Sequence, residues 1–238
     1  MIGGRPTYMK TAEKLLAFLA AVALLAAFFG CSLFKTNRTQ NGTDAPAKTE
    51  EKAKPATVDD LNGLAALYGD LFRTLTKAQT SVAYNDPAVG TTLNAHSTLQ
   101  KEGETLTYRA TVDRLNDADA DRFLTTETLP AVSGTVEEIR ANYSGLFVWD
   151  RVATGLILST PVFTGGNLST PAIRRADGKV TLTGSVPDEK LAAFFGIDVT
   201  GVSGMEITVS YTDAAVLSLA LSYTAGAAAV TVTVTFTY

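Results

Sequence analysis

Hydrophobic and polar positions divide the chain into four stretches of different character. Residues 15–29 are entirely apolar, whereas residues 35–56 contain no aliphatic side chain larger than alanine. Residues 58–79 carry apolar side chains at intervals of three and four, and many later stretches alternate apolar and polar side chains. A period near 3.6 indicates an amphipathic helix, and a period of two indicates half-buried strands. The pattern therefore predicts an apolar leader, a polar tether, one long helix and a β-rich body.

The helix predicted at residues 58–79 has a single apolar stripe. Its members are Val58, Leu61, Leu64, Ala65, Tyr68, Leu71, Phe72 and Leu75. Thr57 and Asp60 have the spacing of a capping box, in which each side chain bonds to the backbone N–H of the other residue. A second, short helix is predicted between Pro187, which suits a first helical turn, and Gly196, which suits a helix end. We expect these two helices to cover the body.

Most of the body predicts antiparallel strands. The ranges with strand-like alternation are residues 91–100, 105–115, 121–129, 145–153, 179–186, 205–211, 216–223 and 228–238. The last three have apolar side chains on one face, Leu217 among them, and Thr and Ser side chains on the other. Residues 136–143 predict a short helix, and residues 160–178 predict a long loop with one short strand around Ile173. The sequence thus predicts an α+β fold, an antiparallel sheet of about nine strands with one oily face under the helices.

The N-terminal stretch has the order of a bacterial export signal. Lys10 and Lys14 precede the apolar run, so we expect translation to start at Met9. The sequence Phe28-Phe29-Gly30-Cys31 resembles the lipobox of bacterial lipoproteins, although Phe28 stands where that family prefers leucine. The resemblance implies that residues 1–30 are a lipoprotein signal peptide. It also implies that Cys31 is acylated, for example with palmitate, and becomes the mature N-terminus.

Two other interpretations of this segment stay open. Residues 15–34 contain one polar side chain and would form about 30 Å of helix, enough for an uncleaved membrane anchor. An ordinary cleaved signal peptide would instead leave a soluble protein. The lipoprotein interpretation places the chain on the extracytoplasmic face of a bacterial cell membrane, held by lipid. It assigns residues 31–57 to the acylated cysteine with a flexible tether, and residues 58–238 to a single domain.

Composition narrows the chemistry of the body. A formal net charge of -4 provides no basic surface for nucleic acid, and no Gly-rich phosphate loop points to a nucleotide. The single cysteine excludes an intramolecular disulfide and a Cys-based zinc site, and the single histidine, His96, disfavours a His-paired nucleophile. Asp117, Asp119 and Asp121 alternate like the start of a calcium loop, but the later ligands of an EF-hand are missing. We therefore expect no cofactor, no metal site and no enzyme activity.

The order of elements resembles the half-barrel lipid-carrier lipoproteins, the LolA and LprG-like group of the bacterial envelope. The stretches that carry the resemblance are KVTLTGSVPDEKLAAFFG, MEITVSYTDAAVLSLALSYT and AVTVTVTFTY. The resemblance implies that the sheet is curved into a half-barrel and that its oily face binds an apolar small molecule or lipid. Candidates for the lining of such a cavity are Phe147, Trp149, Leu182, Ile207, Val209, Leu219, Val232 and Phe236.

Two other functions stay open beside a lipid-binding lipoprotein. The first is a structural or interaction lipoprotein of the cell envelope, whose core is filled by its own side chains and holds no ligand. The second is a hydrolase at the envelope, which would need a cleft with converging carboxylates or an activated serine. Alternating apolar side chains on strands also build ordinary cores, so the alternation alone does not distinguish the carrier from the structural protein. Free space for a ligand beside the oily face would distinguish them.

Overall fold

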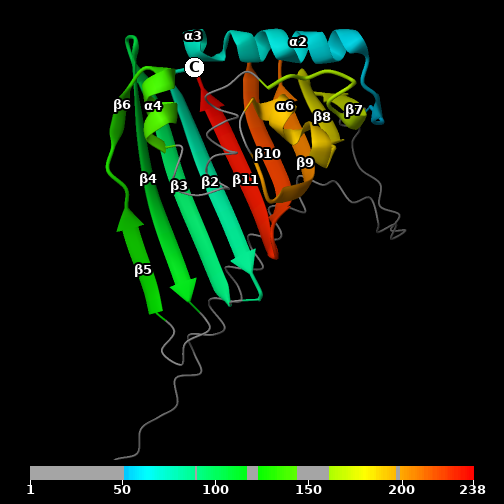
Figure 1. Ribbon diagram of the computed structural model, residues 1–238. Coiled ribbons are helices and arrows are strands. Elements are labelled where there is room, and N and C mark those ends of the chain that lie inside the picture. The colour runs from blue at the N-terminus through cyan, green and yellow to red at the C-terminus, as the bar shows by residue number, and fades with distance from the viewer. Residues whose placement is uncertain (1–50, 89, 117–122, 144–160, 197–198) are drawn as a thin grey trace, which may run out of the picture. The chain divides into compact units, whose positions relative to one another are not determined.

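The computed structural model describes residues 51–88, 90–116, 123–143, 161–196 and 199–238 (Figure 1). All described residues belong to one compact unit, residues 48–238. Within the described ranges, no helix is both long enough and apolar enough to cross a membrane. The predicted leader, Cys31 and most of the tether lie outside the described residues.

This unit is an α+β domain built on one antiparallel sheet, as the alternation predicted. The described residues form eleven strands: β1 (Lys54–Pro55), β2 (Lys77–Asp86), β3 (Thr91–Glu102), β4 (Thr105–Asn116), β5 (Phe123–Thr128), β6 (Val132–Gly134), β7 (Ser169–Ala176), β8 (Lys179–Val186), β9 (Val202–Tyr211), β10 (Val216–Ala225) and β11 (Ala228–Thr237). They follow the order β1-β7-β8-β9-β10-β11-β2-β3-β4-β5, and β6 pairs with β4. The last strand, β11, therefore pairs with β2 and joins a C-terminal half (β7–β11) to an N-terminal half (β2–β5).

Three of these strands, β1, β2 and β6, are absent from the predicted ranges. Strands β1 and β6 have two and three residues, which is too short for an alternating pattern to register. The predicted loop at residues 160–178 also contains more structure than expected, because β7 has eight residues and pairs along its length with β8. The predicted tether likewise ends earlier than residue 57, since Lys54 and Pro55 pair with β7 and the Ala56 N–H donates to the Pro171 carbonyl.

The first helix is shorter than its pattern predicts. Helix α2 (Val58–Gly69) ends at Gly69, a single turn α3 (Leu71–Thr74) follows, and β2 begins at Lys77. The prediction of one continuous helix through residue 79 was therefore wrong at the break after Gly69 and beyond Thr74. Glycine is a weak helix former, and residues 77–86 gain a full ladder of pairings with β11 and β3. Tertiary pairing thus overrides a helical period that continues as far as Leu75.

Helix α2 begins where the capping pattern predicted. The Thr57 side chain accepts from the Asp60 N–H and the Asp60 carboxylate accepts from the Thr57 N–H, so the capping box is complete. Leu61, Leu64 and Tyr68 are buried. Val58 is 71% exposed and does not belong to the buried stripe. The helix packs against β10, and Figure 1 shows it across one end of the C-terminal half of the sheet.

The other predicted helices are confirmed. Helix α4 (Val136–Tyr143) has the predicted bounds. The second predicted helix consists of the 3₁₀ turn η1 (Asp188–Lys190) and α6 (Leu191–Phe195), and η1 contacts β9. Gly196 ends α6 in the left-handed conformation, at φ 67°, where a side chain would be strained.

The core lies on one face of the sheet, which we call the inner face. On β11 the Val and Phe side chains are buried there, and Thr233, Thr235 and Thr237 are exposed on the other face. Strand β10 departs from the predicted alternation at its start: Val216 is fully buried and Leu217 only half-buried. The pairing of β10 with β9 shifts register between Val216 and Ser218, so the extra residue displaces Leu217 from the predicted apolar set.

Candidate ligand-binding site

Inward-facing residues of neighbouring strands form rows across the inner face. The central row consists of Ile173, Leu182, Val209, Leu219, Val234, Thr80, Ser97 and Ala110, in order from β7 to β4. Three of the predicted cavity residues, Leu182, Val209 and Leu219, are direct neighbours in this row. Each of the three has no exposed surface. The row therefore combines apolar positions in the C-terminal half with two hydroxyl side chains in the N-terminal half.

Three further predicted residues lie on the same face. The second row consists of Ile207, Leu221, Val232, Val82, Ala95 and Val112, and so contains Ile207 and Val232. Phe236 lies opposite Ala78 on β2 and is 6% exposed. The remaining candidates, Phe147 and Trp149, lie outside the described residues. The structure thus brings six of the eight predicted side chains onto one face of the sheet.

Aromatic rings form a compact group over the C-terminal half, which we call the aromatic cluster. Its members are Tyr68 of α2, Phe163 of the segment before β7, Phe194 and Phe195 of α6, and Phe236 of β11. The ring centroids of Tyr68 and Phe163 are 5.0 Å apart, and those of Phe163 and Phe194 are 5.3 Å apart in an edge-to-face arrangement. Such pairs contribute about 0.5–1.5 kcal/mol each beyond the area that they bury. The cluster therefore holds α2, α6 and β11 together.

Three hydroxyl groups are buried without a hydrogen-bond partner in the part of the chain that the structure describes. They belong to Tyr68, Thr80 and Tyr211. Burial, together with the nearby Tyr238, raises the pKa of the Tyr68 phenol, and burial and the Asp60 carboxylate raise the pKa of Tyr211. Both phenols therefore stay neutral and keep their protons. The large majority of buried polar side-chain atoms in native proteins are hydrogen-bonded, so each of these hydroxyls marks a position where a partner is missing.

Within the two rows on the inner face, the side chains become smaller from the C-terminal to the N-terminal half. The small-residue area lies on β2, β3 and β4 and consists of Thr80, Val82, Ala95, Ser97, Ala110 and Val112. Ser97 is half-buried, although its inward neighbours on the same strand, Ala95 and Leu99, are only 5% and 1% exposed. Ser97 thus keeps some exposed surface next to the unpaired Thr80 hydroxyl. The sequence analysis missed this area because it assigned no strand to residues 80–86.

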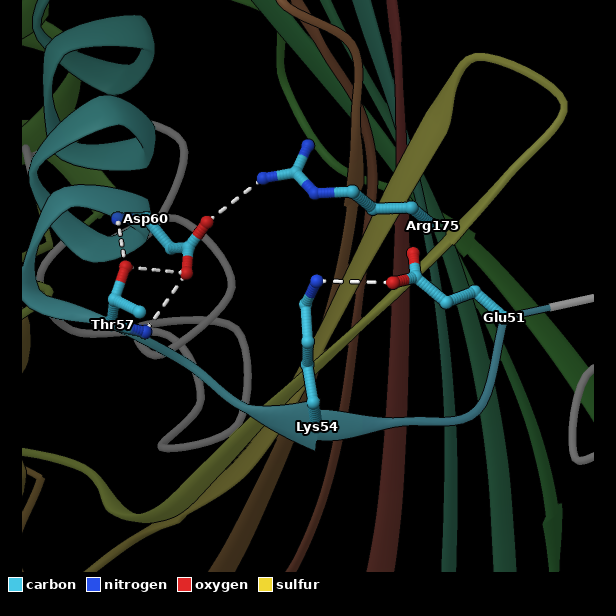
Figure 2. A network of polar contacts seen from close by, with 5 residues as sticks. All are labelled: Glu51, Lys54, Thr57, Asp60 and Arg175. Atoms are coloured by element: carbon cyan, nitrogen blue, oxygen red, sulfur yellow. Dashed lines mark hydrogen bonds and ion pairs between the residues drawn. The ribbon is translucent and has the colours of Figure 1, made fainter.

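A polar contact fixes the start of α2 to the edge of the sheet that β1 and β7 form (Figure 2). Asp60 Oδ1 accepts from Arg175 of β7 at 2.8 Å, and Asp60 Oδ2 accepts from the Thr57 N–H at 2.8 Å. Burial by itself would raise the pKa of the Asp60 carboxyl, but the hydrogen bonds from Thr57 and Arg175 outweigh it and hold this pKa below its usual value. Figure 2 also shows Lys54 of β1 bonded to Glu51 at 3.0 Å. These contacts join the end of the tether and the helix to one sheet edge.

Several titratable side chains outside the inner face have structural partners. Asp188 accepts from the Gly204 N–H at 2.9 Å, and Glu138 caps α4 by accepting from the Thr135 N–H at 2.8 Å. His96 is exposed on the outer face, with Nδ1 3.2 Å from Ser81 Oγ. The three aspartates at residues 117–121 lie outside the described residues. Within the described ranges, His, Cys, Asp and Glu side chains form no group of three that could hold a metal ion.

No family model matches the chain, and no curated protein matches it. Among solved structures, the chain is similar to the lipoprotein LppX of Mycobacterium tuberculosis, with 11% identity and a TM-score of 0.38 over 76% of this chain and 95% of that one. LprF from Mycobacterium bovis is similar with 13% identity and a TM-score of 0.37, over 77% and 93% of the two chains. A bifunctional dehydratase-cyclase domain from ambruticin biosynthesis has 12% identity and a TM-score of 0.17 over 74% and 80%. Identities and TM-scores this low do not transfer a function from those proteins to this chain.

Proposed function

We propose that the chain is an extracytoplasmic lipoprotein that binds or carries an apolar, lipid-like ligand on the inner face of its sheet. An acyl group on Cys31 would hold it to a bacterial membrane, and the residues up to about position 50 would act as the tether. Each buried methylene of an acyl chain contributes about 0.8 kcal/mol, so multiple chains would hold the domain durably. The protein would act by binding and would perform no catalytic step.

The observation that carries the proposal is the small-residue area with its unpaired hydroxyl. Thr80 is 3% exposed and its Oγ1 has no partner among the described residues, although both of its neighbours on the inner face of β2 are apolar. A hydroxyl that is buried among apolar side chains and left unpaired costs about 1–3 kcal/mol, and a partner supplied by a ligand would remove this cost. A ligand with an apolar body and a few oxygen atoms would both fill the area and satisfy the hydroxyl.

The aromatic cluster favours the alternative, a structural lipoprotein with a self-filled core. Phe163, Phe194 and Phe195 have at most 1% of their surface exposed and pack edge to face, as in an ordinary core. The two candidate functions therefore differ in the N-terminal half of the sheet, where the side chains are small. Space reserved for a ligand on β2–β4 supports the carrier, and a filled inner face there supports the structural protein.

Photo-cross-linking to a lipid tests the proposal directly. The full-length chain would be reconstituted into phosphatidylcholine vesicles that contain a small fraction of a diazirine-bearing diacylglycerol, irradiated and mapped by peptide mass spectrometry. The carrier predicts labelled peptides from residues 77–112. Labels confined to residues 9–34, which include the leader, would contradict a ligand site in the domain.

A matched pair of variants separates a ligand site from incidental labelling. Ala95→Phe places a large ring on the inner face of β3, and Asn94→Phe places the same ring on the exposed outer face of the same strand. The carrier predicts that Ala95→Phe folds and loses the label, whereas Asn94→Phe keeps it. A self-filled core predicts instead that Ala95→Phe destabilises the protein by about 1–3 kcal/mol through overpacking, with no label to lose.

The anchor needs an experiment of its own. Cells that express the full-length chain would be grown with radioactive palmitate, and we expect label on the wild-type protein and none on Cys31→Ser. Label that survives the substitution, or a wild-type protein without label, would remove the acylated cysteine from the proposal.

A further inference from the structure

We infer that Thr80 and Ser97 form a polar subsite that receives the ester carbonyl of an acylated ligand. The inference rests on the proposed function, because it names the chemistry of one part of the ligand. An ester carbonyl is the oxygen that an otherwise apolar acyl chain carries, and it only accepts hydrogen bonds. Hydroxyl donors on a greasy surface would therefore select an ester over a plain hydrocarbon.

The strand registers place the two hydroxyl residues side by side. Thr80 of β2 pairs with Ser97 of β3, and both belong to the central row. Residues that are directly opposite in an antiparallel pair have Cβ atoms about 4.5–5.5 Å apart, which lets two short side chains reach one oxygen. A carbonyl oxygen has two lone pairs and accepts from two donors. The pair thus matches a carbonyl in both number and spacing.

The surroundings of the pair are apolar in every direction along the inner face. Ala78 and Leu99 lie on one side of the pair, Val82 and Ala95 lie on the other, and Ala110 follows Ser97 in the row. A hydrocarbon chain that extends from the carbonyl in either direction along the strands therefore meets apolar side chains. Ala95 and Ala110 are short side chains, so a ligand chain there would contact the sheet closely.

A single bound water fits the pair less well than an ester does. A buried water makes about three hydrogen bonds, and this site offers two hydroxyl groups. The backbone N–H and C=O groups of Thr80 lie in ladders with β11 and β3 on both sides, so they are already engaged. An apolar area with two donors would hold a water that lacks partners, whereas an ester carbonyl is satisfied by the two hydroxyls.

The test compares two probes of equal length on the full-length chain in phosphatidylcholine vesicles. One is a diazirine-bearing methyl ester of palmitic acid, and the other is a diazirine-bearing hydrocarbon without oxygen. Thr80→Val keeps the shape of the side chain and removes the hydroxyl, Thr80→Ser keeps the hydroxyl, and Ser81→Val changes a hydroxyl on the exposed outer face of the same strand. The readout is the yield of each probe on peptides from residues 77–112.

The inference predicts that Thr80→Val lowers the ester yield about fivefold and leaves the hydrocarbon yield unchanged, which is the effect of one hydrogen bond. Thr80→Ser and Ser81→Val should both retain the wild-type ratio of ester to hydrocarbon. If both probes label the wild-type domain equally and Thr80→Val changes neither yield, the polar subsite is overturned and the proposed function stays intact. Failure of both probes to label the wild-type domain would instead remove the proposed function and the subsite with it.

Discussion

Replacing Tyr68 with phenylalanine should make the ligand-free protein more stable. The ring of Tyr68 is 1% exposed and packs 5.0 Å from Phe163 and 6.4 Å from Phe236, and phenylalanine keeps these contacts. Only the hydroxyl is removed, and it has no hydrogen-bond partner among the described residues. In the unfolded chain that hydroxyl is hydrated, so folding now carries a desolvation cost that phenylalanine avoids.

The expected magnitude follows from that cost. An unpaired buried hydroxyl destabilises a protein by about 1–3 kcal/mol, so Tyr68→Phe should raise the free energy of unfolding by up to this amount. For a domain of about 180 residues, each kcal/mol raises Tm by about 2–4 °C. Tyr238→Phe is the matched control, because its hydroxyl donates to the Val216 carbonyl at 2.7 Å. Loss of that bond should lower the free energy of unfolding by about 1 kcal/mol.

Urea unfolding of delipidated full-length protein in a mild non-ionic detergent, followed by far-ultraviolet circular dichroism, measures both variants. Tyr68→Phe should shift the midpoint to higher urea and Tyr238→Phe to lower urea, with unchanged slopes. A loss of stability in Tyr68→Phe that equals the loss in Tyr238→Phe would refute the reasoning. It would mean that the Tyr68 hydroxyl is bonded in the native protein and does not mark a missing partner.

Three further substitutions test other parts of the structure. Asp60→Asn should lower stability at neutral pH. Because the pKa of Asp60 is lowered in the folded state, the difference from wild type should shrink as the pH falls from about 4 through the folded pKa. Urea titrations at pH 7 and pH 3 check this, and a difference that is no smaller at pH 3 would contradict it. Phe194→Ala should cost about 3–5 kcal/mol, since its ring is fully buried, whereas Val162→Ala, at a side chain 45% exposed, should stay within about 0.5 kcal/mol of wild type. Lys101→Met should cost about 1 kcal/mol, because the ammonium group donates to the Phe72 carbonyl at 2.6 Å at the end of α3, and an unchanged Tm in a thermal scan would count against that role.

Local periodicity predicted most of the strands because each has one buried and one exposed face. The ranges of β4, β8, β10 and β11 agree with the predictions within a few residues, and α4 has the predicted bounds. In these segments the apolar side chains of the alternating pattern are the ones that are buried, so the pattern is sufficient to predict the strand. The capping box of Thr57 and Asp60 was also predictable, because both its partners lie within four residues.

Local sequence patterns mispredict the structure where long-range pairing decides it. Residues 77–79 were included in the predicted helix, yet they begin β2, because β11 provides a ladder from more than 150 residues away. No local pattern contains that information. Leu217 is a second case, since a register shift between β10 and β9 moves it off the inner face.

The candidate site was predictable in one half only. Leu182, Ile207, Val209, Leu219, Val232 and Phe236 were found because large apolar side chains alternate clearly, but the same feature makes them ordinary core residues. The small-residue area was missed because alanine, serine and threonine give no strong signal for either face. Thr80 becomes informative only when its burial and its lack of a partner are known.

Native mass spectrometry of the full-length chain, released from mild detergent without prior delipidation, tests the central claim most directly. We predict a population with the mass of a lipid in addition to the protein and any acyl groups on Cys31, and we predict that Ala95→Phe lacks this population while Asn94→Phe retains it. A wild-type mass that equals the protein with its covalent acyl groups alone, in every charge state, would contradict the claim that the inner face of β2–β4 holds a ligand.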